Sequence, residues 1–237
     1  MEQGAKTDYS ERDRFAPDET FQIGTNYSRL GDAMRQAIFS GEFEPGMRLK
    51  VQDLSRRYMV STNPIREALQ QLQGEGLVDI VPNRGATVRV ITRQLVSNIF
   101  DIREAIDVML ARRAVKVVTP ENIEHLRQIN LRLHEARLIG DGEQASALSS
   151  GFHEYIGEIV GNPQAVKVRR DHSNIFRSIR MRYGFAEGRE AEIIREHEEI
   201  IDALASGEED RAEAAVLIHA QNAKADILDR VTDLAEF

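Results

Sequence analysis

Residues 61–72 read STNPIREALQQL, and this segment decides the fold of the N-terminal region. Ser61 is a favoured helix N-cap, and Pro64 lies in the first turn, where its missing N–H costs little. Four apolar residues recur at helical spacing on one face: Ile65, Ala68, Leu69 and Leu72. The segment therefore predicts an amphipathic helix that ends near Gly74 or Gly76.

The chain on either side of this helix completes a small module. Upstream, apolar residues at helical spacing predict a helix over 27–40, and a second, shorter helix fits 52–58. Downstream, the β-like runs 77–81 and 86–91 are joined by Pro-Asn-Arg-Gly at 82–85, which is typical of a hairpin tip. Three helices followed by a two-stranded hairpin are the plan of a winged helix-turn-helix.

The other face of the 61–72 helix is polar and is expected to meet base edges in the major groove of DNA: Thr62, Asn63, Arg66, Gln70 and Gln73. Arginine and glutamine make bidentate contacts there. Nearby basic residues suit phosphate contacts: Arg29, Arg35, Lys50, Arg56 and Arg57. Arg84, at the hairpin tip, suits a minor groove. The alternative is a small helical module in which the arginines only solvate the surface and bind no DNA.

The net charge of −8 is unevenly distributed along the chain. Residues 1–24 hold 3 basic and 6 acidic residues, residues 25–92 hold 9 and 7, and residues 93–237 hold 19 and 26. We therefore expect a flexible polar tail, a mildly basic winged helix-turn-helix module and a larger acidic module over these three ranges. The acidity that argues against a nucleic-acid partner belongs to the tail and the third range.

Composition excludes several classes of site. The chain has no cysteine, so it has no disulfide, no thiolate metal site and no cysteine nucleophile. No apolar run approaches the roughly 20 residues of a membrane span, and residues 1–10 lack the apolar core of a signal peptide. We therefore expect a cytoplasmic protein with no membrane partner, in which any metal binds to histidine nitrogen.

Residues 93–237 show helical periodicity throughout and are interrupted by Pro120 and Pro163. Six helices are expected, and they begin near Thr92, Pro120, Leu148, Pro163, Glu190 and Glu208. Nothing in this range is typical of a sheet. The pattern predicts an all-α antiparallel bundle, so the chain as a whole is expected to be mainly α.

Three histidines face the apolar side of three different expected helices: His153, His197 and His219. Inward histidines on separate helices can converge on a metal, and neutral imidazole suits Zn, Ni, Fe or Cu. The alternative is that each is a hydrogen-bonded core histidine. The other three are expected to lie in water on the surface: His125, His134 and His172.

Three ordered segments of the N-terminal region are similar to a known family. They are SGEFEPGMRL at 40–49, VSTNPIREAL at 60–69, and GLV at 76–78 followed by PNRGA at 82–86. Together they resemble the DNA-binding domain of the GntR family. This resemblance implies a dimeric, ligand-responsive bacterial transcription factor.

Two residues match functional positions of that family and two depart from it. Arg66 matches a base-contacting arginine of the recognition helix, and Gly85 matches the glycine at the wing tip. Thr62 stands where the family usually has arginine, and Gln52 stands where many members have a second DNA-contacting arginine. The fold assignment survives these departures, but the operator sequence cannot be taken from relatives.

The C-terminal region also contains short motifs that are shared with a known family: Arg103-Glu-Ala-Ile-Asp107 with Ala111, Phe152-His153, Gly161-Asn-Pro163, Glu196-His197 and His219. They resemble the FCD ligand-binding domain of the FadR subfamily. In metal-binding members of that subfamily, one aspartate and three histidines bind a divalent cation. His153, His197 and His219 match the histidines, whereas Ser149 stands at the aspartate position. The resemblance implies a Zn or Ni site completed by water or by an effector carboxylate, or histidines that bind an anionic effector without metal.

The same resemblance implies that the effector is a small carboxylic acid. Arg103 matches an arginine that holds the effector carboxylate, a role that suits a planar guanidinium. The alternative for Arg103 is an intrahelical ion pair with Asp107, four residues later. Ser149, Arg177 and Arg180 are further candidates for the effector pocket.

Three functions compete at this point. The first is a homodimeric regulator that dimerises through its C-terminal domain and binds a palindromic operator in double-stranded DNA, with repression the commoner mode in the family. The second is an enzyme that uses a three-histidine metal site. Against it, Glu154, Glu196 and Glu198 adjoin the histidines in sequence and are expected on other helix faces, so no general base stands out. The third is an interaction scaffold, which leaves Arg66 and the inward-facing histidines without a role.

Overall fold

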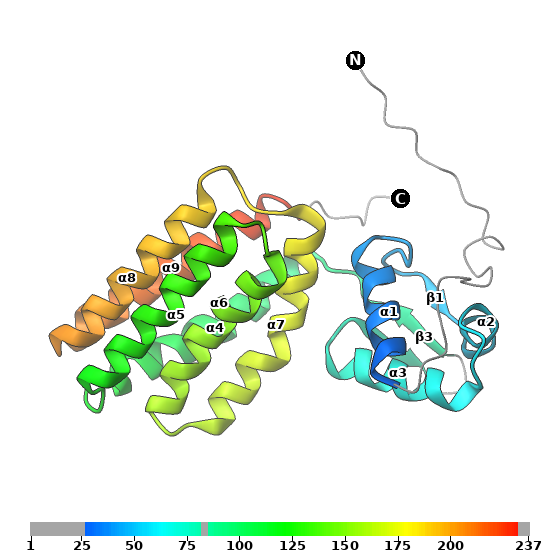
Figure 1. Cartoon of the computed structure of the whole chain (residues 1–237), viewed down its shortest axis with the longest axis horizontal. Helices are drawn as coiled ribbons and strands as arrows, with labels where there is room; N and C mark the ends of the chain where they lie inside the picture. Colours follow the sequence, from blue (N-terminus) through cyan, green and yellow to red (C-terminus); the bar gives the residue numbers. More distant parts are fainter. Residues whose placement is uncertain (1–26, 82–84, 232–237) are drawn as a thin grey trace, which may run out of the picture. The chain divides into compact units, whose positions relative to one another are not determined.

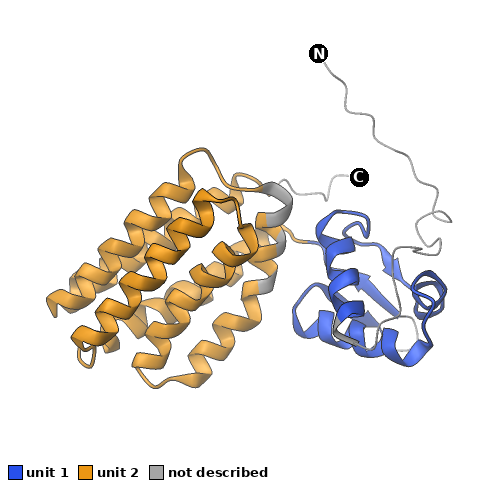
Figure 2. Cartoon of the chain, viewed as in Figure 1, with its two compact units in different colours: residues 1–90 blue, residues 91–237 orange. Residues whose placement is uncertain are grey.

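The computed structural model of the chain describes residues 27–81 and 85–231. The chain divides into two compact units, residues 1–90 and 91–237 (Figure 2). The expected tail and Arg84 at the expected hairpin tip lie outside the described residues.

Over residues 27–81 and 85–90, the first unit contains three helices and a small antiparallel sheet (Figure 1). Its elements are α1 (Tyr27–Phe39), β1 (Arg48–Leu49), α2 (Val51–Arg57), α3 (Thr62–Gly74), β2 (Val78–Val81) and β3 (Gly85–Val88). The apolar face expected for α3 is buried in one core with Met34 of α1 and Leu54 of α2. The winged helix-turn-helix fold is thereby confirmed.

The sheet contains one strand that the sequence did not predict. Its order is β1-β3-β2, and β1 joins the expected hairpin through Arg48 opposite Thr87 and Leu49 opposite Ala86. A two-residue strand is too short to show the alternation of apolar and polar residues that identifies strands in a sequence. Only its pairing with β3 makes it visible.

The turn between α2 and α3 is held by one left-handed residue and two hydrogen bonds. Met59 adopts a left-handed conformation with φ of 51°. The Ser55 hydroxyl donates a hydrogen bond to the Val60 carbonyl at 2.5 Å, and the Val60 amide donates to the Ser55 carbonyl at 3.2 Å. Ser61 occupies the predicted N-cap position in an extended conformation, although its side chain makes no capping hydrogen bond. These contacts set the angle at which α3 leaves the turn.

Gly85 allows β1 to lie against β3. Its φ is +89°, a conformation that L side chains rarely adopt, and a Cβ placed there would lie 2.4 Å from the Leu49 carbonyl oxygen. The wing strand therefore begins at a position that only glycine fits.

The second unit is a bundle of six helices over its described residues (Figure 1). They are α4 (Arg93–Ala114), α5 (Pro120–Leu138), α6 (Gly142–Ile159), α7 (Pro163–Tyr183), α8 (Arg189–Ser206) and α9 (Glu209–Leu228). Four of them begin behind a side-chain N-cap: Thr92, Thr119, Asp141 and Asn162. The expected all-α bundle is confirmed. Helix α6 starts six residues before Leu148 because Asp141 caps it and its first turns are polar.

The main core of the bundle draws residues from all six helices, with Ala165 from α7, and its larger side chains include Leu110, Leu126, Phe152, Ile200 and Leu204. None of the helices in the described part of the chain has the length and apolar character to cross a membrane. The histidines expected to face inward lie on three of these helices.

Candidate metal and effector centre and DNA-binding face

The three expected histidines converge in the interior of the bundle. His153 of α6, His197 of α8 and His219 of α9 are all buried. Their ring centroids are 4.9–5.2 Å apart, and one ring nitrogen from each lies within 4.8 Å of the others. The Nε2 atoms of His153 and His219 are 3.1 Å apart. Periodicity in three separate helices thus produces one cluster of nitrogen atoms.

Two of the histidines are oriented by hydrogen bonds at Nδ1. His197 Nδ1 lies 3.2 Å from Asn130 Oδ1, and the ring stacks on Phe152 at 4.0 Å. His219 Nδ1 lies 2.7 Å from Glu196 Oε2. These contacts leave the Nε2 atoms for the centre of the cluster, and Nε2 of His197 is buried without a hydrogen-bond partner among the described residues. Oriented imidazoles of this kind are typical of metal ligands.

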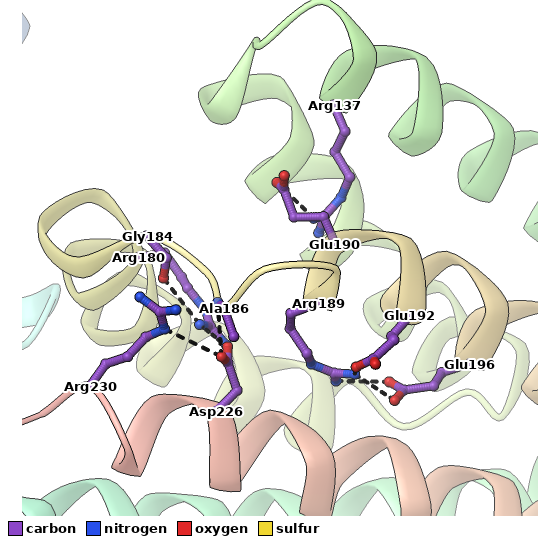
Figure 3. Close-up of polar contacts among 10 residues, drawn as sticks. All are labelled: Arg137, Arg180, Gly184, Ala186, Arg189, Glu190, Glu192, Glu196, Asp226 and Arg230. Atoms are coloured by element: carbon purple, nitrogen blue, oxygen red, sulfur yellow. Dashed lines mark hydrogen bonds and ion pairs between the residues drawn. The ribbon is translucent and has the colours of Figure 1, made fainter.

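Glu196 contacts a histidine of the cluster, a contact that its place in the sequence did not predict. Glu196 does not contact His197, its neighbour in sequence, but it accepts the hydrogen bond of His219 on the next helix, because α8 and α9 pack against each other. Arg189 holds the same carboxylate at 2.5 and 2.8 Å, as Figure 3 shows, and Asn222 donates to it at 2.7 Å. Burial opposes ionisation of Glu196, but these hydrogen bonds outweigh it and lower its pKa to about 2.

The electrostatics of the cluster suit a divalent cation. Burial, with the nearby charge of Arg169, lowers the pKa of His153 well below the ordinary value, and burial does the same for His197. Both rings are therefore neutral at pH 7, which is the form that binds metal. Nitrogens that each lie about 2.1 Å from one Zn ion are about 3–3.5 Å apart. The His153–His219 spacing matches that range, so the residues present fit a metal.

Ser149 lies one turn before His153 on α6 and is half-buried. It provides no carboxylate to the cluster. A metal bound to the three histidines would therefore keep a coordination position for water or for an anionic ligand.

The intrahelical pair with Asp107, which was the alternative role for Arg103, is not formed among the described residues. Asp107 instead accepts two hydrogen bonds from Arg169 of α7, from Nε and, at 2.8 Å, from Nη2. The Arg103 guanidinium packs on the ring of Phe176, 4.6 Å from its centroid. Burial, with the charge of Arg169, lowers the pKa of Arg103 to about 9. Arg103 is thus a half-buried cation without an ion pair among the described side chains.

Arg169 is a functional candidate that the sequence reasoning missed. It stands in a run of charged residues, Lys167 to Asp171, that is typical of a solvated helix face. However, it shares a helical stripe with Ala165 and Val166, which are buried, and it is itself only 1% exposed. Its place on that apolar stripe was the available signal.

The expectation that His172 lies in water is also wrong. It is half-buried on α7, and its Nδ1 is buried without a partner in the described part of the chain. Burial and the charge of Arg103 lower its pKa. His125 and His134 are exposed, as expected.

The other two arginines named for the effector pocket contact protein groups elsewhere. Arg180 pairs with Asp226 of α9 and donates to the Gly184 carbonyl at 3.2 Å (Figure 3). It also packs on the ring of Phe185. Arg177 pairs with Glu143 of α6 at 2.7 Å. Over the described residues, neither guanidinium contacts the three histidines.

The polar face of α3 is available for a partner. Asn63, Arg66 and Gln70 are exposed and Thr62 is half-buried. Arg66 makes no ion pair or hydrogen bond with the described side chains, which contrasts with Arg56, paired with Asp53 at 2.5 Å. Two of the basic residues suggested for phosphate contacts are also engaged: Arg35 with Glu75 and Arg57 with Glu42.

Comparisons with known proteins agree with both units. The family model "Bacterial regulatory proteins, gntR family" matches residues 26–88, and the FCD domain model matches residues 98–222, more than half of the chain. The HTH-type transcriptional repressor RspR of Escherichia coli strain K12 is 30% identical over 192 residues, which cover 79% of this chain and 82% of the relative. An uncharacterised HTH-type regulator of Bacillus subtilis strain 168, YdhC, is 26% identical over 198 residues, 81% of this chain and 87% of the relative.

A solved structure shares the fold. It is the putative GntR transcriptional regulator of Rhodococcus sp. RHA1, with a TM-score of 0.67 and 23% identity, over 88% of this chain and 100% of the other. At this identity the likeness supports the fold alone.

Proposed function

Since this chain belongs to the GntR family of HTH-type transcriptional regulators and carries an FCD domain, we propose that a small carboxylic acid controls its binding to DNA. The observation that carries the proposal is the convergence of three buried histidines, with a half-buried Arg103 that has no ion pair among the described residues of the same helical bundle. A carboxylate bound there would be held by a guanidinium and by the histidine centre.

A divalent cation, Zn or Ni, completes this proposal. His153, His197 and His219 would hold it, with Asn130 and Glu196 fixing the orientation of two of the rings. The cation supplies a Lewis-acidic position for the effector carboxylate. Ser149 leaves that position to the effector or to water.

On the DNA side, we propose that α3 enters the major groove. Arg66 is the principal base contact and acts with Thr62, Asn63 and Gln70, whereas Arg56, Arg84 and Gly85 belong to the backbone and wing contacts. The exposure of Arg66 and its lack of an ion pair among the described residues support this role.

The remaining parts of the proposal concern assembly and organisation. The functional division is a tail over 1–24, a DNA-binding domain over 25–92 and an effector and dimerisation domain over 93–237. Two copies join through the last of these and bind a palindromic operator as a repressor. The site of action is the cytoplasm.

The enzyme alternative has no support. The families that match and the relatives are transcriptional regulators. The carboxylate of Glu196 binds Nδ1 of His219 and the guanidinium of Arg189. It therefore lies on the side of the His219 ring that faces away from the centre of the cluster. A general base would have to face the reacting group.

Fluorescence anisotropy with DNA from the chain's own promoter tests the proposal. Arg66→Gln should weaken binding by about 5- to 150-fold, equivalent to about 1–3 kcal/mol for one bidentate base contact. The matched control is Arg132→Gln, which removes an exposed arginine of the other unit and should leave binding unchanged. In the same assay, at least one of a panel of short-chain carboxylates should shift the affinity of the wild type. Equal affinities for the two variants would contradict the DNA-binding role of Arg66, and a panel without effect would contradict the effector.

A further inference from the structure

Arg169 is held between two helices in a way that leaves part of it unused. Its Nε and Nη2 atoms bind both oxygens of Asp107, which is on α4. Its third nitrogen, Nη1, is buried and has no hydrogen-bond partner among the described residues. A buried N–H without a partner is costly, and such groups in native proteins commonly mark a ligand site or another functional role.

The packing of α4 against α7 brings the guanidinium of Arg169 near enough to Arg103 for the two charges to repel each other. Arg103 and Asp107 are one turn apart on α4. On α7, Arg103 touches Phe176 and Asp107 binds Arg169, so the helices run in opposite directions at this contact. His172, with a buried and unpartnered Nδ1, lies between those two positions on α7. Unused polar groups of Arg103, Arg169 and His172 therefore gather in one place.

The charges at this place do not balance. Arg103 and Arg169 are two cations, and Asp107 is a single carboxylate. Glu154, the other carboxylate that acts on Arg103, already pairs with the exposed Arg170 at 2.6 Å. The half-buried guanidinium of Arg103 therefore remains without a charged partner among the described residues, and a charge that is partly shielded from water is stabilised by pairing.

We infer that the carboxylate of the effector binds between two guanidiniums, accepting hydrogen bonds from Arg169 Nη1 and from Arg103. The inference rests on the proposed function, since it adds a second arginine to the same ligand. One carboxylate balances the charge, and the ligand class is a small organic acid rather than its neutral amide. Asp107 is a positioning residue, because it fixes the plane of the Arg169 fork and so aims Nη1.

Titration calorimetry and thermal unfolding of the full chain test this inference. The probes are acetate, lactate and succinate, each compared with its amide at constant ionic strength. At least one acid should bind the wild type, and its amide should not. Arg103→Gln and Arg169→Gln should each weaken that binding at least tenfold. The matched control is Arg170→Gln, which removes the adjacent, exposed arginine and should leave binding unchanged.

A double variant separates binding from folding. Asp107→Asn combined with Arg169→Gln replaces the ion pair by a neutral amide pair, so no buried charge is left alone. Affinity should stay low in this variant if Arg169 holds the ligand, and recovery of wild-type affinity would show that Arg169 only balances Asp107. Should the double variant not fold, side-chain NMR of the wild type labelled with ¹⁵N-arginine decides. Two protected guanidinium signals should move when the acid is added, and movement of only one overturns the inference.

The outcomes also separate this inference from the proposed function. If Arg103→Gln abolishes binding and Arg169→Gln does not change it, the effector site stands and the second arginine is wrong. If none of the acids binds the wild type, both are wrong.

Discussion

Nδ1 of His219 on α9 and Oε2 of Glu196 on α8 are 2.7 Å apart, and both side chains are largely shielded from water. Because Glu196 fills the Nδ1 side of the ring, the Nε2 side faces His153. The carboxylate thereby sets which face of the imidazole is available to a ligand.

Glu196→Gln should therefore weaken metal binding. A carboxylate that accepts a hydrogen bond from a metal-binding histidine typically raises the metal affinity by about 10- to 100-fold, because it orients the ring and increases its basicity. Competition with a chromogenic chelator measures the change for Zn and Ni. Glu199→Gln, one turn along α8 and exposed, is the matched control and should bind metal as the wild type does. Identical affinities in the two variants would rule out the orienting role.

Ser149→Asp should strengthen metal binding by tenfold or more. The substitution places an anionic oxygen ligand one turn before His153 and supplies compensating negative charge. The same chelator competition measures it, with Ser150→Asp, one residue further along α6, as control. A smaller gain for Ser149→Asp than for Ser150→Asp would show that this position does not face the histidine centre.

Asp226→Asn should lower the free energy of unfolding at pH 7 by about 2–4 kcal/mol, because it leaves the largely buried Arg180 without its charged partner. Burial opposes ionisation of Asp226, but Arg180, Ala186 and Arg230 together lower its pKa below the ordinary value (Figure 3). A carboxyl group whose pKa is lowered by folding contributes its full stabilisation above the unfolded pKa of about 3.9. That stabilisation is lost as the pH falls from there through the lower pKa of the folded state.

Urea unfolding of the wild type and Asp226→Asn from pH 7 to pH 3 checks both parts of that prediction. The difference between the two proteins should be constant down to about pH 5 and should shrink below pH 4. Asp229→Asn, an exposed neighbour on the same turn, should change stability little at any pH. A difference as large at pH 3 as at pH 7 would show that the charge of Asp226 is not what stabilises this end of the bundle.

Gly85→Ala should destabilise the wing by about 1–3 kcal/mol, because it combines a positive φ with a Cβ that meets the Leu49 carbonyl oxygen at 2.4 Å. Hydrogen exchange of the Leu49 and Ala86 amides reports the β1–β3 pairing and should become faster. Gly74→Ala, with no atom within 4 Å of the added Cβ, should leave exchange unchanged. Equal protection in the two variants would contradict the steric argument.

The sequence by itself determined the elements and their buried faces. The spacing of apolar residues predicted α3, with Arg66 on its polar face. It also predicted that His153, His197 and His219 lie on the buried faces of three helices. These are local properties, since the period of a helix decides which side chains share a face and burial follows apolar character.

Only the tertiary structure decided which polar groups meet. Asp107 binds Arg169, 62 residues away, rather than Arg103 on its own helix, and His219 is held by Glu196 rather than by a neighbour in sequence. Strand β1 likewise exists through its pairing with β3. The register between helices distant in sequence depends on how all their side chains pack together, and no short-range period contains it.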